Sequence, residues 1–157
     1  MAKNDNKQPE IQYEDFKRGW DEADAEASGQ FVSLSDDGDS ITGVLVGEPI
    51  NFKKTNPQGQ PRSAFRMAFW SVEEARFLIW EGGKKAYKRM RKWIDEDLTG
   101  VEDVPRTIVY IKRIGDKGDT STVYTFETVE AVSDDLAAMM GTEEVPDIRP
   151  RKQTPNG

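Results

Sequence analysis

The sequence of 157 residues contains neither cysteine nor histidine. Without cysteine the chain has no disulfide and no thiol nucleophile, and nothing in it is built for an oxidising compartment. Without histidine it lacks the commonest general base, and zinc sites made from histidine and cysteine are excluded as well. We therefore expect a protein that is not an enzyme and that holds no metal or cofactor.

Long apolar runs are also missing from the sequence. No stretch approaches the roughly 20 apolar residues that a membrane helix needs. Residues 1–10 are polar, unlike the start of a secreted protein. These features predict a soluble, cytoplasmic protein that has no membrane partner.

The net charge of −7 is distributed unevenly along the chain. Residues 49–92 contain 11 Lys/Arg against 3 Asp/Glu, a local charge of +8. Residues 1–48 contain 4 against 12, and residues 93–157 contain 7 against 14. A basic block between acidic segments indicates a binding surface for an anionic partner. Chance clustering of charges on solvated faces would give the same pattern.

The length fits one domain with tails. Residues 1–28 form an acidic segment that we expect to be partly disordered or weakly helical. Within it, Tyr13 to Ala27 has an apolar stripe at helical spacing, made of Phe16, Trp20, Ala23 and Ala27. Residues 29–132 are predicted to form the main domain. Residues 133–157 are predicted to be a short helix and a disordered tail.

Apolar alternation and turn residues predict the elements of the main domain. After a strand-like stretch at 30–34, strands are expected at 40–46, 62–70, 75–80, 107–113 and 120–129, with a helix at 84–97. Three strands, a helix and two strands are the order of a five-stranded OB-fold Greek-key barrel, whose helix lies between strands 3 and 4. The predicted class is therefore mainly β.

The strand at 62–70 shows the clearest alternation. Phe65, Met67 and Phe69 share one face, which we assign to the core. Arg66 and Trp70 share the other face, and we interpret that face as exposed and functional.

A protein that binds single-stranded nucleic acid needs cations for the phosphates and flat side chains for the bases. The predicted phosphate contacts are Lys53, Lys54, Arg62, Arg66, Arg76, Lys112 and Arg113. The predicted stacking residues are Phe52, Trp70, Trp80 and Tyr124. Trp80 could equally cap the barrel, whereas Trp93 is expected in the core. The lysines that follow Gly82 and Gly83 are either a solvated helix face or a phosphate site.

Short signatures are spread over residues 31–132 and just before them, namely Gly29–Leu34, Asp37–Ile41, Gly47–Pro49, Phe69-Trp70, Ile79–Glu81, Lys112–Thr120 and Tyr124. In these the chain resembles phage-encoded single-stranded DNA-binding proteins of the OB type. The resemblance implies a protein of the host cytoplasm that coats and protects DNA during replication, recombination or repair, beside proteins of those processes. Many relatives have an acidic C-terminal tail, but residues 147–157 include Arg149, Arg151 and Lys152. We hypothesise that the acidic residues 10–26 take over that role or compete with DNA.

A second class of function fits the acidic flanks. The chain could be a protein-interaction module, or an acidic nucleic-acid mimic that acts on a host nucleic-acid-binding protein. RNA is an alternative ligand because stacking does not depend on the 2′-hydroxyl. The sequence leaves the oligomeric state open.

Overall fold

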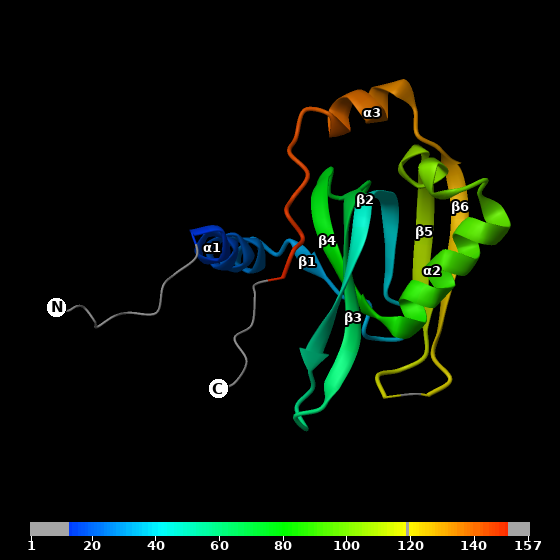
Figure 1. Ribbon diagram of the computed structural model, residues 1–157. Helices are drawn as coiled ribbons and strands as arrows, with labels where there is room; N and C mark the ends of the chain where they lie inside the picture. The colour runs from blue at the N-terminus through cyan, green and yellow to red at the C-terminus, as the bar shows by residue number, and fades with distance from the viewer. Residues whose placement is uncertain (1–12, 119, 151–157) are drawn as a thin grey trace.

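The computed structural model describes residues 13–118 and 120–150, which combine helices with one sheet (Figure 1). The elements are α1 (Tyr13–Ala27), β1 (Phe31–Val32), β2 (Ser40–Thr55), β3 (Pro61–Ser71), β4 (Arg76–Gly83), α2 (Lys84–Asp97), the 3₁₀ helix η1 (Val101–Arg106), β5 (Thr107–Ile114), β6 (Val123–Ala131) and α3 (Asp134–Met140). The helix expected at 84–97 is confirmed, and residues 13–27, for which the sequence indicated only weak helicity, form a helix of 15 residues. No helix in the described ranges is long and apolar enough to cross a membrane.

The six strands form one mixed sheet in the order β1-β4-β3-β2-β5-β6. β2, β3 and β4 are successive antiparallel neighbours, β5 pairs antiparallel with β2 and β6, and β1 pairs parallel with β4. The sheet curls into an open half-barrel. Because the sheet is mixed and is accompanied by three α-helices, the fold belongs to the mixed α/β class. The prediction of a mainly β, five-stranded OB-fold Greek-key barrel is wrong, because the sheet has six strands, one of them parallel, and does not have the OB strand order.

The sheet stays open because β4, one of the two strands that would have to meet, already has another neighbour, while β6 ends the sheet. The outer edge of β4 is occupied by β1, with Phe31 opposite Ile79. Helix α2 packs against β6, β3 and β4 and fills the open side. Its Trp93 donates a hydrogen bond from Nε1 to Thr128 Oγ1 of β6, at 3.2 Å. Periodicity specifies strands and their faces, but not which edges pair.

The face of the sheet toward α2, here called the inner face, carries the larger hydrophobic core. Helix α2 contributes a buried apolar stripe at helical spacing, made of Ala86, Met90, Trp93 and Ile94. The Trp93 ring stacks on Phe126, with ring centroids 5.6 Å apart. The ring centroid of Phe126 lies 6.1 Å from that of Trp80, whose side chain is fully buried. Trp93 is therefore confirmed as a core residue, and Trp80 belongs to the same core.

The opposite, outer face carries a second hydrophobic cluster that the sequence did not predict. Its buried members are Ala25, Val44, Val46, Ala68, Trp70, Phe77, Ile79, Ile108 and Ile148. Trp70 is 2% exposed and meets Phe77 edge-on at 4.9 Å between centroids. The alternation along β3 is confirmed. The interpretation of the face with Arg66 and Trp70 as exposed is wrong, because this sheet is covered on both sides.

Residues 141–150, which we call the strap, run from α3 across the outer face toward α1 (Figure 1). Composition assigned them to a disordered tail, yet Ile148 is buried in the outer cluster. Arg18 of α1 holds the strap by donating to the carbonyl oxygens of Asp147, at 3.0 Å, and Arg149, at 3.1 Å. Helix α1 and the strap therefore cover the outer face together. The disorder predicted for 1–12 and 151–157 concerns residues outside the described ranges.

We expect Trp70→Ala to lower the free energy of unfolding by about 3–5 kcal/mol, because it removes a large buried side chain and leaves a cavity. Trp20→Ala makes the same chemical change at a side chain that is 62% exposed. It should change the free energy by less than about 0.5 kcal/mol. Urea unfolding followed by circular dichroism measures both variants. Equal effects would show that Trp70 is not a core residue.

Candidate functional site

The residues predicted to bind nucleic acid do not form one surface. Trp70 lies in the outer cluster and Trp80 in the inner core, so neither ring offers a face to a base. Their burial removes both tryptophans from the set of stacking residues. The remaining candidates differ in whether their charge is already neutralised by a partner.

Arg66 is the most enclosed of the predicted cations, at 8% exposure. Its guanidinium donates to Glu81 at 2.9 Å and to Glu22 of α1 at 2.7 Å. It also lies over the rings of Phe31 and Phe52, 4.8 and 5.2 Å from their centroids. Arg66 therefore fastens α1 to the sheet, and little of its charge is available to a ligand.

Glu81 lies between Arg66 and Lys54, and it pairs with both. Burial by itself raises the pKa of the Glu81 carboxyl. The hydrogen bonds from Lys54 and Arg66 outweigh that effect and hold the pKa below its ordinary value. Lys54 is thus tied into the same network as Arg66.

Two further predicted cations stabilise turns. Arg76 donates to Glu74 at 2.9 Å, next to the β3–β4 turn. Arg113 donates to the carbonyl oxygen of Gly115 and to the hydroxyl of Tyr124, both at 2.8 Å. Arg113 and Tyr124 therefore brace the loop that joins β5 to β6.

Lys53, Arg62 and Lys112 have no carboxylate partner in residues 13–118 and 120–150. The structure does not bring the three together. Lys53 and Arg62 lie on the distal half of the β2–β3 hairpin, whereas Lys112 lies on β5 opposite Ser40. Of the three, Lys53 lines a hollow beside the start of α2.

That hollow is a groove of about 550 Å³ between the β2–β3 hairpin and the start of α2. It is lined by Asn51, Phe52, Lys53, Ser63, Ala64, Phe65, Gly83, Lys84, Tyr87 and Lys88, and its surface is mostly apolar. Lys53, Lys84 and Lys88 are exposed, and none of them pairs with a carboxylate of the described part of the chain. We call this site the lysine groove.

Two glycines shape the groove where β4 turns into α2. A Cβ on Gly82 would come within 2.9 Å of the Phe65 ring, so the close approach of strand and ring requires glycine here. Gly83 occupies the N-cap position of α2 and supplies no side-chain hydrogen bond to the N–H groups at the start of the helix. The free N–H groups at the start of a helix attract anions, and Lys84 stands beside them.

Tyr87 supplies an aromatic ring that is only partly buried. It meets Phe65 at 5.6 Å between centroids, with the rings inclined by 60°. Phe52 borders the groove, but its ring lies against the Arg66 guanidinium. Sequence reasoning missed Tyr87 because it lies between the basic face and the apolar stripe of α2. The available signal was its spacing of three residues from Lys84, which places the two side chains on the same side of the helix.

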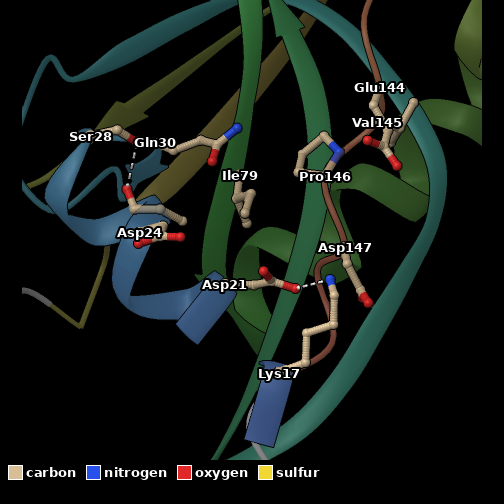
Figure 2. A pocket seen from close by; sticks show the side chains of 11 residues that line it. Lys17, Asp21, Asp24, Ser28, Gln30, Ile79, Glu144, Val145, Pro146 and Asp147 are labelled. Carbon is tan, nitrogen blue, oxygen red and sulfur yellow. Dashed lines mark hydrogen bonds and ion pairs between the residues drawn. The ribbon is translucent and has the colours of Figure 1, made fainter. Parts of the chain in front are cut away.

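A second hollow, of about 560 Å³, lies between α1, the strap and the sheet (Figure 2). Its acidic lining consists of Asp21, Asp24, Glu144 and Asp147. Asp21 is already paired with Lys17 at 3.1 Å, and Asp147 with Arg149 at 2.8 Å. The described residues contain no group of three or more side chains suited to hold a metal ion. An acidic lining repels phosphate, so the lysine groove is the candidate site for an anionic ligand.

We expect the pairing of Glu81 to make the stability of the fold depend on pH. Because its folded pKa is lowered, the ionised carboxylate stabilises the fold above its unfolded pKa, and this contribution is lost as the pH falls through the folded pKa. Glu81→Gln should cost about 1–3 kcal/mol at neutral pH and flatten the loss of stability on acidification. Glu127→Gln, on an exposed position of β6, is the control. Parallel pH profiles for wild type and Glu81→Gln would contradict this account.

Comparison of the chain with models of protein families, with curated proteins and with solved structures found no match. The resemblance to phage-encoded single-stranded DNA-binding proteins stays a prediction. The geometry of the lysine groove is therefore the main indication of what the chain binds.

Proposed function

We propose that this chain binds single-stranded DNA in the lysine groove and catalyses no reaction. The observation that carries the proposal is the combination of three lysines that lack carboxylate partners with a mostly apolar lining that includes the Tyr87 ring. Binding of a single strand needs cations for the phosphates and a flat apolar surface for the bases. The groove offers both within one turn of α2.

The phosphates are assigned to the lysines. Lys84 and Lys88 stand one turn apart on α2, and Lys53 approaches from the hairpin on the other side. The start of α2 adds the partial positive charge of its free N–H groups. Lysine is a point charge that fits a phosphate from many directions, so this contact tolerates any base sequence.

The base is assigned to the ring of Tyr87 and the apolar lining beside it. A base reaches this surface only when it is unpaired, because a duplex keeps its bases stacked inside the double helix. A volume of about 550 Å³ suits a nucleotide-sized group. The site therefore favours a single strand over a duplex.

Binding of this kind, without sequence preference, suits a protein that coats and protects exposed strands. Replication, recombination and repair in a phage-infected cell are the processes that the sequence resemblance implies. RNA has the same phosphates and bases, so matched DNA and RNA oligonucleotides belong in every binding experiment.

We expect Lys84→Glu/Lys88→Glu to abolish measurable binding of labelled oligo-dT, and Tyr87→Ala to weaken it by about 1–3 kcal/mol. Wild-type affinity should fall with a slope of about −2 in log K against log salt, as expected for three phosphate contacts on a single strand. Fluorescence anisotropy of the labelled oligonucleotide measures all three effects.

The matched control is Arg91→Glu/Lys92→Glu, which changes the net charge by the same amount on the same helix. Arg91 and Lys92 lie outside the groove and are 3.8 and 3.9 Å from Asp95 and Glu96. This control should keep most of the affinity. If both double variants lose binding equally, general charge rather than the groove determines affinity. If the wild type binds no oligo-dT even at low salt, the proposal is wrong, and the protein-interaction module becomes the function to pursue.

A further inference from the structure

Helix α1 carries an apolar stripe that the described fold leaves uncovered. The helix docks on the sheet through its buried residues Arg18 and Ala25. Phe16 and Trp20 point the other way, are 48% and 62% exposed, and contact each other edge-on at 6.5 Å between centroids. Trp20 is the only one of the four tryptophans that is exposed. The stripe expected from the sequence exists, but it is not the face that docks.

The stripe, made of Phe16, Trp20, Ala23 and Ala27, has the spacing of a coiled-coil seam. Its members follow at intervals of four, three and four residues, as the a and d positions of a heptad do. Its first three members and Gly19 line an open hollow of about 250 Å³. In a coiled coil, a side chain of the facing helix inserts into a hole formed by four such residues.

We propose that α1 of one copy pairs antiparallel with α1 of a second copy through this stripe. A two-fold axis between residues 21 and 22 places Trp20 opposite Ala23 of the second copy. The same axis places Phe16 opposite Ala27 of the second copy, so each large side chain meets a small one. Lys17 then stands on the same side of the seam as Asp24 of the second copy, which gives two opposite-charge pairs.

This self-complementarity is the reason to assign the surface to a second copy. An isologous contact needs matching large and small groups, and one helix provides both halves. The helix is roughly 22 Å long, so the contact falls short of the about 1,200 Å² that stable interfaces bury. The pairing is therefore a weak dimerisation, populated at high protein concentration and further favoured where several copies occupy one strand.

The dimer contact and DNA binding in the lysine groove are expected to respond to salt in opposite directions. Helix α1 contains six acidic and two basic residues, so two copies repel each other at low ionic strength. Added salt screens the repulsion and strengthens the dimer, whereas it weakens phosphate contacts. The inference does not depend on DNA binding, so each proposal can fail without the other.

Sedimentation velocity of the full chain, without DNA, tests the dimer over micromolar to near-millimolar concentrations at low and high salt. We expect a monomer–dimer equilibrium that high salt favours. Trp20→Ala should raise the dissociation constant at least about tenfold, while alanine keeps the helix intact. Val129→Ser, which changes an exposed apolar residue of β6, should leave it unchanged. A monomer at every concentration, or a dimer that Trp20→Ala does not weaken, overturns the proposal.

The orientation is tested by cross-linking, because the chain contains no cysteine of its own. Under mild oxidation, a mixture of Phe16→Cys chains and Ala27→Cys chains should form the mixed disulfide dimer. Phe16→Cys chains alone should not cross-link. Efficient cross-linking of Phe16→Cys chains alone would overturn the antiparallel arrangement.

Acrylamide quenching of Trp20 fluorescence in the monomer tests whether the stripe is accessible. Protection of Trp20 from quenching would show that a segment of the same chain covers the stripe, and would overturn the proposal.

Discussion

The central strand of the sheet is apolar on both faces, and this constraint organises the rest of the molecule. Eight consecutive residues of β3, from Ala64 to Ser71, are buried. One face needs α2 as its cover, and the other needs α1, α3 and the strap. Because the outer face is covered, Arg66 and Trp70 are buried. Burial of the Arg66 charge is tolerated because Glu22 and Glu81 form ion pairs with it.

The same covering separates the cations into two groups. Those on or near the covered face and at the turns, such as Arg66, Lys54 and Arg113, are satisfied by carboxylates or carbonyl oxygens. At the start of α2, Lys84 and Lys88 are exposed and pair with no carboxylate of the described residues, whereas Lys85 donates to the carbonyl oxygen of Thr120. A chain with a net negative charge can thus present a local cationic groove, and position within the fold matters more for an anionic ligand than total charge does.

Helix α1 has two separate faces with different roles. Arg18 and Glu22 connect it to the strap and to β3, which makes it part of the covering of the outer face. The opposite face leaves Phe16 and Trp20 exposed to solvent, and it is the face that we propose binds a second copy. A helix that is fastened on one side and apolar on the other can join two copies without disturbing the sheet or the groove.

The sequence by itself determined the helix at 84–97, the helical spacing of the stripe in 13–27, the alternation along β3, the core position of Trp93 and the basic block that contains the groove. These features follow from side-chain spacing within single elements, which is local. It identified Lys53 and left the start of α2 ambiguous, but it missed Tyr87. Only the tertiary structure decided that the sheet stays open, that Trp70 is covered, and that Arg66 is neutralised. Those outcomes depend on partners far along the chain, such as Ile148 in the cluster of Trp70 and Glu22 beside Arg66, and no local pattern encodes which distant surfaces will meet.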